Sequence, residues 1–173
     1  MVCGSIALYR FFNHQVLLFL LLAVRDFIIA FYFLKRFEKT SGVSRRVEWM
    51  SYFSAILPMF YFNPSGHPLF PYAYESAQIL AVLGYTFSTF ALFDLGKSFG
   101  IAPAVRGKRV KTGLYSIVKH PMYIGYAVAE VGTVFLNPVN GTLFAASIGL
   151  YWWRATAENR LIDSEKILEM QIA

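Results

Sequence analysis

The feature that most constrains this chain is a series of long apolar stretches separated by short polar loops. Each stretch is close to the ~20 residues that a helix needs to cross the hydrocarbon core of a bilayer. None shows the alternation of a barrel strand, and a helix pairs its backbone polar groups internally. We therefore predict an all-α fold, a polytopic bundle of about five transmembrane helices. The stretches lie at 13–34, 47–62, 76–96, 121–137 and 141–157.

Composition agrees with a bilayer environment. The chain is 57% hydrophobic and only 15% charged, which is too apolar for an ordinary soluble domain. Its net charge of +6 does not indicate nucleic-acid binding, because the basic residues lie in short loops beside apolar stretches. The single cysteine, Cys3, excludes an internal disulfide and a cysteine-based zinc site, and we predict no metal site. We expect one membrane domain, 1–173, in which 1–91 forms the first spans and 92–173 carries the chemistry.

The distribution of basic residues predicts the orientation in the membrane. Loops 35–46 and 97–119 are rich in Lys and Arg, whereas loop 63–75 and turn 137–141 contain neither. Cytoplasmic loops collect Lys and Arg, so the two basic loops should face the cytoplasm. The N-terminus is then outside and the C-terminus cytoplasmic.

Charged residues and a proline interrupt the apolar stretches. Arg25 and Asp26 lie midway along the first stretch, where ionisable groups are costly and often functional. Because neighbouring residues point in different directions on a helix, we do not expect these two to pair with each other. Bundle contacts and substrate contacts both remain open for them. Asp94 is within helical reach of Lys97, which favours an ordinary ion pair. Pro58 predicts a kink in the second stretch.

A His-Pro-Met-Tyr run at 120–123 opens the fourth stretch. Pro121 suits the first position of a helix, so the run predicts a helix start with His120 at its mouth. A helix N-terminus offers free N–H groups and a positive dipole end, which suit the carboxylate of an amino-acid-like ligand. Helical spacing places Glu130 on the same face as Tyr123. The alternative is an interfacial aromatic belt with a solvated histidine.

The fifth stretch ends with Arg154 and Glu158, four residues apart on one helix face. Such a pair can be an ordinary surface ion pair. The short turn 137–141, however, makes the last two helices antiparallel neighbours, so Glu158 should meet His120. Together they offer an acid for an ammonium, N–H donors for a carboxylate and aromatic faces for a sulfonium and an adenine. These are the groups of S-adenosylmethionine.

Several ordered motifs resemble the isoprenylcysteine carboxyl methyltransferase family, within a broader group that includes phospholipid N-methyltransferases. The resemblance covers about 92–162, and the first two stretches resemble only generic helices. The motifs are Leu95-Gly96-Lys97-Ser98-Phe99, Thr112-Gly113-Leu114-Tyr115 and Val118-Lys119-His120-Pro121-Met122-Tyr123, followed by Arg154, Glu158 and Leu161.

The resemblance implies a helical membrane enzyme that binds S-adenosylmethionine between the last two spans and the cytosolic loop. A lipid-like acceptor would enter from the bilayer, and Arg154 would orient its carboxylate as the catalytic residue. Direct methyl displacement relies on positioning and on the exclusion of water rather than on a metal. The cofactor-binding residues it implies are Tyr115, Lys119, His120, Pro121, Tyr123 and Glu158.

Two positions depart from the family pattern. Lys119 replaces the usual Arg, which loses a planar bidentate fork, and Asn159 replaces a second acid. From the resemblance as a whole, carboxyl O-methylation of a lipid-like or isoprenoid-bearing acceptor is the leading interpretation. The alternatives are N-methylation of a phospholipid amine, and a non-catalytic membrane scaffold or degenerate relative.

Overall fold

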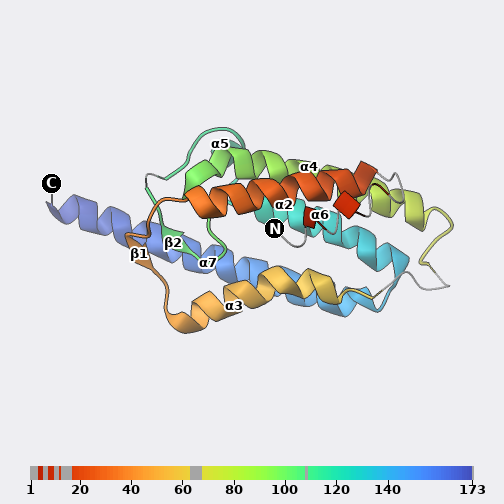
Figure 1. The fold of residues 1–173 in the computed structure, drawn as a ribbon. Helices are drawn as coiled ribbons and strands as arrows, with labels where there is room; N and C mark the ends of the chain where they lie inside the picture. The colour runs from red at the N-terminus through yellow and green to blue at the C-terminus, as the bar shows by residue number, and fades with distance from the viewer. Residues whose placement is uncertain are drawn as a thin grey trace.

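The computed structural model describes residues 4–5, 8–9, 12, 17–62, 68–107 and 109–172. Within these ranges the chain forms an elongated helical bundle (Figure 1). Predictions that concern Cys3, Lys108 or residues 13–16 and 63–67 lie outside the described residues. The long helices are α2 (Leu17–Lys35), α3 (Arg45–Ile56), α4 (Ala73–Leu95), α6 (Pro121–Leu136) and α7 (Asn140–Ile172). The short elements are η1 (Leu57–Phe60), η2 (Gly96–Ser98), α5 (Leu114–Ile117), β1 (Ser41–Gly42) and β2 (Ala104–Val105).

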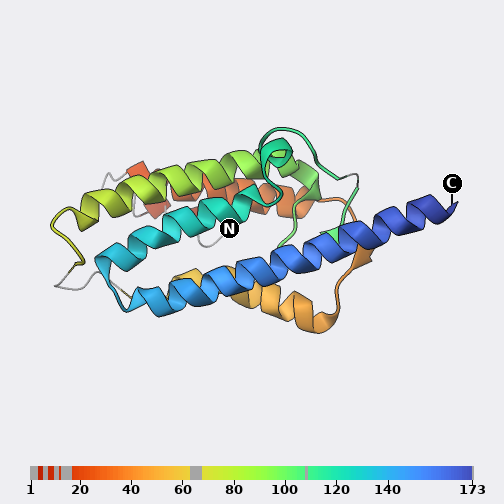
Figure 2. The same cartoon turned by 180° about the vertical axis from the view of Figure 1, so that it is seen from behind.

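Each predicted apolar stretch contains a long helix, so the predicted helical class is confirmed. At Pro58 the structure changes from the α-helix α3 to the 3-10 helix η1, with the proline in the first turn of η1. This fits the prediction of an interrupted helix, because proline has no N–H to continue the α-helical ladder. Helix α7 continues far beyond 157 as one rod (Figure 2).

Helix α4 has the clearest membrane character. With its following turn it spans Ala73–Ser98, and among the described residues it is the one helix both long and apolar enough to cross a bilayer. Helix α6 is apolar but shorter. The number of spans and their orientation therefore stay predictions.

Helices α4 and α6 pack backbone to backbone through small residues. A Cβ added to Gly125 would lie 2.7 Å from the carbonyl oxygen of Gly84, and one added to Gly132 would lie 2.9 Å from Cα of Ala77. Small residues at a helix interface permit such close approach, as in membrane helix pairs. This contact fixes α6, and with it the His-Pro helix start, against α4.

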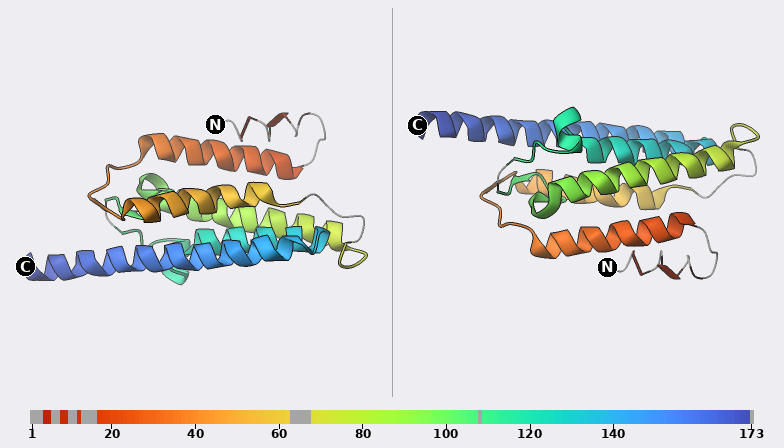
Figure 3. Two further views of the ribbon diagram at one scale, coloured as in Figure 1. Left: turned by 90° about the horizontal axis from the view of Figure 1, so that it is seen from below. Right: turned by 90° about the horizontal axis from the view of Figure 1, so that it is seen from above.

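The loops that follow α2 and α4 meet at one end of the bundle. Strands β1 and β2 pair antiparallel there, with Ser41 opposite Val105 and Gly42 opposite Ala104. Helix α5 and the C-terminal part of α7 lie at the same end, as the two views in Figure 3 show. Both basic loops of the sequence are therefore gathered at one end of the molecule.

Asn140 anchors the start of α7 at the opposite end. Its buried side chain accepts from the N–H of Phe62 at 2.8 Å and donates to the carbonyls of Phe62 and Thr133. Nearby, Glu130 accepts hydrogen bonds from Tyr61 and Tyr151. These contacts join α7 to α6 and to the segment after η1.

Candidate functional site

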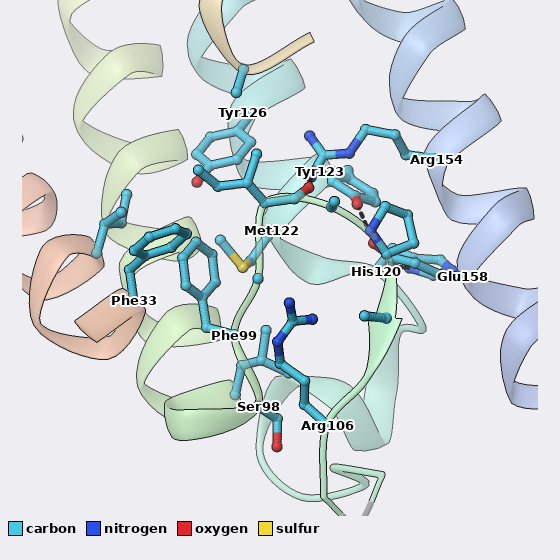
Figure 4. Close-up of a pocket in the computed structure, with 18 of the residues that line it drawn as sticks. Phe33, Ser98, Phe99, Arg106, His120, Met122, Tyr123, Tyr126, Arg154 and Glu158 are labelled. Carbon is cyan, nitrogen blue, oxygen red and sulfur yellow. Dashed lines mark hydrogen bonds and ion pairs between the residues drawn. The ribbon is translucent and has the colours of Figure 1, made fainter. Parts of the chain in front are cut away.

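A cavity of about 1130 Å³ lies between the helices at the end where the loops meet (Figure 4). Helices α2, α4, α6 and α7 contribute to its wall, together with residues 98–107 of the loop that contains β2. The volume is slightly above the usual range of small-molecule sites. The lining side chains labelled in Figure 4 are Phe33, Ser98, Phe99, Arg106, His120, Met122, Tyr123, Tyr126, Arg154 and Glu158.

The start of α6 and the middle of α7 meet at this cavity, as predicted. His120 Nδ1 lies 3.1 Å from Glu158 Oε2, and the Tyr123 hydroxyl donates to Glu158 Oε1 at 2.5 Å. His120 occupies the position just before the first residue of α6, Pro121. The predicted helix start is therefore confirmed, and Glu158 joins two residues of the His-Pro-Met-Tyr motif.

Three aromatic rings form a stack beside this acid. The His120 ring lies 5.7 Å from the Tyr123 ring with an interplanar angle of 21°, and Tyr123 lies 5.5 Å from Tyr151 at 6°. These near-parallel rings cross from α6 to α7 and present flat aromatic surface at the cavity wall. Such faces attract cations and planar groups. The three stacked rings thus line the cavity together.

Asn159, one of the two departures from the family pattern, also contacts the motif. Its Oδ1 atom lies 3.3 Å from His120 Nε2, and its side chain lines the cavity. Both ring nitrogens of His120 therefore have a partner on α7. An amide at this position retains a polar contact to the imidazole that an acid would also make.

Arg154 is buried, and its guanidinium has two hydrogen-bond partners, although its Nε has none among the described residues. Its guanidinium donates to Ser54 Oγ at 2.9 Å and to the Ile101 carbonyl at 2.5 Å, and it lies 5.0 Å from the centre of the Tyr123 ring. The ordinary surface ion pair with Glu158 is not formed between these described side chains. Arg154 instead connects α7 to α3 and to the loop that covers the cavity.

The remaining predicted cofactor residues lie in different surroundings. Tyr115 in α5 and Lys119 line the cavity, whereas Pro121 is fully buried in the first turn of α6. Burial and then the charge of Glu158 raise the pKa of Tyr115, so its phenol stays protonated. Pro121 acts on the site through the position of the helix start.

Asp94 has a different role from the one we predicted. Its carboxylate accepts the N–H of Leu114 at 2.8 Å, while the Lys97 ammonium lies 5.8 Å from the centre of the Phe37 ring. The expected Asp94–Lys97 pair is therefore wrong. A carboxylate at a helix start accepts a hydrogen bond from a free N–H, and its charge interacts favourably with the positive end of the helix dipole. Gly113 has φ of 57°, and a Cβ there would collide with the Asp94 carboxyl group.

Arg25 and Asp26 line the cavity from α2. The Arg25 guanidinium lies 2.7 Å from Asp26 Oδ1 and 4.6 Å from the centre of the Tyr85 ring. Our expectation that these neighbours do not pair is wrong, because the long arginine side chain folds back to the adjacent carboxylate. The pair reduces the cost of both charges within an apolar bundle.

Arg106 also lines the cavity, although the sequence indicated it only as one of the basic residues of a cytoplasmic loop. It is 8% exposed, and its Nε atom has no hydrogen-bond partner in the described part of the chain. Figure 4 shows its guanidinium pointing into the cavity. An unpaired arginine in a half-polar loop gives no recognisable sequence signal.

The donor set fits S-adenosylmethionine. Glu158 suits an ammonium, the rings of His120 and Tyr123 suit a sulfonium or an adenine, and the unpaired Arg106 suits a carboxylate. These groups line one cavity that continues between the helices. The arrangement therefore has the chemistry to hold a cationic amino-acid cofactor beside an apolar chamber.

Comparison with known proteins identifies a family for this chain. The sequence model of the isoprenylcysteine carboxyl methyltransferase family matches residues 77–168. Protein-S-isoprenylcysteine O-methyltransferase B of Arabidopsis thaliana is 32% identical over 85 residues, which are 46% of this chain and 41% of that relative. The aligned part thus spans less than half the length of the relative. No solved structure matches the chain. Since the family match covers more than half of the chain and includes both halves of the His120–Glu158 contact, the chain belongs to the isoprenylcysteine carboxyl methyltransferase family.

Proposed function

We propose that this protein is an integral membrane methyltransferase that transfers a methyl group from S-adenosylmethionine to the carboxylate of a lipid-like acceptor. The observation that carries the proposal is the contact of His120 and Tyr123 with Glu158 at the wall of a cavity enclosed by apolar helices. The family membership and the name of the plant relative support an isoprenoid-bearing cysteine as the acceptor class.

The cofactor would occupy the end of the cavity next to the start of α6. Glu158 would hold its ammonium, and Tyr115, Lys119, His120 and Tyr123 would line its binding site. When bound, the cofactor supplies an electrophilic methyl group on a sulfonium. The rings next to Glu158 provide the flat, electron-rich surface that such a cation prefers.

The acceptor carboxylate would bind at Arg154. The guanidinium has five N–H donors and gives one each to Ser54 and Ile101, so donors remain for an anion. Those two bonds hold the side chain in place, which favours a defined orientation of the acceptor. A carboxylate is already a nucleophile near neutral pH, so the site needs no general base for this reaction.

An apolar wall would receive the lipid part of the acceptor and exclude water. Phe99, Met122 and Leu92 form a buried core cluster, and Phe33 and Ile29 of α2 pack against it. Phe33, Ile29, Phe99 and Met122 also line the cavity. Exclusion of water from the cavity strengthens the electrostatic interactions among its charged groups and prevents hydrolysis of reactive groups.

The site would face the cytoplasm in a multi-pass protein. Both basic loops lie at the cavity end of the bundle, where the positive-inside tendency places the cytoplasm. An acceptor in the inner leaflet would then reach the cavity laterally, while the cofactor arrives from the cytosol. The supporting structural element is α4, whose length and composition suit a bilayer.

The first experiment is a calorimetric titration of S-adenosylhomocysteine into the detergent-purified protein and its His120→Ala and Glu158→Ala variants. We expect saturable binding by the native protein and its loss in both variants. Absence of binding by the natively folded protein contradicts the proposal. Thr142→Ala serves as a control, because its exposed side chain donates to the carbonyl of Val139 at the far end of the bundle.

A second measurement separates carboxyl transfer from amine transfer. An amine acceptor must lose a proton before it attacks, so its methylation rises with pH through the pKa of the amine. A carboxylate acceptor is ionised throughout the neutral range, so its methylation shows no such rise. A flat rate between pH 6.5 and about 8.5 supports the carboxylate.

A further inference from the structure

The guanidinium of Arg106 is a buried cation with an unsatisfied hydrogen-bond donor. Arg106 follows β2 in the loop over the cavity, and 8% of its surface is exposed. Its Nε has no hydrogen-bond partner, and no ion pair to Arg106 is formed by the described residues. A buried charge without a partner costs several kcal/mol, so a protein rarely keeps one without a ligand or function.

The surroundings of Arg106 disfavour its charge further. Burial and then the nearby charge of Arg36 lower the pKa of Arg106, against weaker opposing effects of Tyr52 and Glu48. An arginine nevertheless remains protonated in proteins. A bound anion in the cavity would remove this unfavourable state, because it would supply both a hydrogen-bond acceptor and a counter-charge.

Gly100 fixes where the Arg106 guanidinium lies. A Cβ added to Gly100 would stand 2.8 Å from Nη1 and 3.0 Å from Cζ of Arg106. The guanidinium thus packs on the bare backbone of Gly100. The next residue, Ile101, accepts the hydrogen bond from Arg154. Arg154 therefore holds the same loop segment on which Arg106 rests, and both cations line the cavity.

The two arginines lie on different sides of the site. In Figure 4 Arg154 lies on the side of Tyr126, whereas Arg106 rises from the side of Ser98, with His120 and Met122 between them. Ser98 ends η2, which follows α4 at the loop end of the bundle, and Tyr126 lies further along α6 into the apolar part. Arg106 is thus at the loop end of the cavity.

We propose that Arg106 binds the carboxylate of the cofactor's amino-acid end, while Glu158 binds its ammonium. The proposal rests on the proposed function, because it assigns one more group to the same cofactor. An amino-acid end carries one negative and one positive group, and the loop end of the cavity offers one buried cation and one acid. The acceptor carboxylate is left to Arg154.

Two ligands isolate this contact by calorimetry. S-adenosylhomocysteine carries both the carboxylate and the ammonium, and its decarboxylated analogue, S-adenosyl-3-thiopropylamine, keeps the ammonium alone. We expect Arg106→Gln to weaken binding of S-adenosylhomocysteine roughly tenfold to a hundredfold, as for a lost charge-assisted hydrogen bond. The same variant should change binding of the decarboxylated analogue less than about twofold.

Three further variants test the position as well as the charge. Lys111→Gln removes an exposed cation from the same loop, outside the lining of the cavity, and should leave both affinities unchanged. Gly100→Ala keeps every charge but displaces the Arg106 guanidinium. It should therefore weaken binding of S-adenosylhomocysteine more than binding of the decarboxylated analogue. Glu158→Gln should weaken both ligands, because both contain the ammonium.

The outcomes distinguish this inference from the proposed function. If the native protein binds neither ligand, the proposed function fails, and this inference fails with it. If the native protein binds S-adenosylhomocysteine and Arg106→Gln binds it equally well, only the assignment of Arg106 is overturned. Equal weakening of both ligands by Arg106→Gln, in a variant with native thermal stability, also overturns it, since the effect then does not involve the carboxylate.

Discussion

His120 Nδ1 lies 3.1 Å from Glu158 Oε2 and joins the mouth of α6 to the middle of α7, although 38 positions separate the two residues in the chain. Tyr123 reaches the other oxygen of the same carboxylate at 2.5 Å. Glu158 thus holds two members of the His-Pro-Met-Tyr motif at the cavity wall. This contact is the centre of the proposed cofactor site.

The Tyr123 hydroxyl should matter less for binding than the Glu158 carboxylate. Tyr123→Phe keeps the ring stacked between His120 and Tyr151 and removes only the hydrogen bond to Glu158. We expect a loss of S-adenosylhomocysteine affinity of about fivefold, because the hydroxyl only positions the acid through a hydrogen bond, and a larger loss for Glu158→Gln, which removes the charge itself. Calorimetry on the two variants measures this ratio. A larger loss of affinity in Tyr123→Phe than in Glu158→Gln contradicts the role assigned to the acid.

Backbone contact between α4 and α6 makes Gly125 intolerant of a side chain. A Cβ there would lie 2.7 Å from the Gly84 carbonyl and 2.8 Å from Ser88 Cβ, so Gly125→Ala should destabilise the protein by about 1–3 kcal/mol. Thermal unfolding in detergent measures the change. Gly149→Ala is the matched control, because a Cβ there meets no atom within 4 Å. An alanine in the open helical position should be neutral or stabilising.

Asp94 should stabilise α5 as a helix cap. Asp94→Ala removes the acceptor for the N–H of Leu114 and should cost about 1 kcal/mol, whereas Asp94→Asn keeps an acceptor and should cost less. Because α5 carries Tyr115, the alanine variant should also weaken cofactor binding. Equal stability of the native protein and Asp94→Ala, compared by thermal unfolding, would falsify the assignment.

Replacing only Asp26 of the Arg25–Asp26 pair should destabilise the protein more than replacing both residues. Asp26→Asn leaves the Arg25 charge in an apolar helix without its ion-pair partner, and we expect a loss of about 3 kcal/mol. Replacing both residues, as in Arg25→Met with Asp26→Asn, removes the uncompensated charge and should recover part of this loss. Thermal unfolding of the two variants measures the difference in their stability. A double variant less stable than Asp26→Asn is inconsistent with a mainly electrostatic pair.

The meeting of α6 and α7 was predictable from local signals. Pro121 marks a helix start, and the short turn at 137–141 brings the following helix back alongside. Those two facts place His120 near Glu158 without any knowledge of distant contacts. The helical class followed in the same way from the length of the apolar stretches.

Other contacts depend on information that the sequence pattern does not contain. Asp94 caps a helix that begins 20 positions later, and the Arg25 side chain folds back on its neighbour against simple helix geometry. Arg106 is buried because β2 pairs with β1. In the sequence, two long helices, α3 and α4, separate these two strands. Each depends on how loops fold over the bundle, whereas helical periodicity describes only the helices themselves.

The most direct test of the central claim is methyl transfer from labelled S-adenosylmethionine to N-acetyl-S-farnesylcysteine by the purified protein in lipid vesicles. The acetyl group blocks the amine, so only the carboxylate can accept the methyl. We expect the label in a base-labile methyl ester, with formation abolished in Glu158→Ala and strongly reduced in Arg154→Ala. Absence of an ester from protein that binds S-adenosylhomocysteine would contradict carboxyl methylation of a prenylated cysteine by this chain.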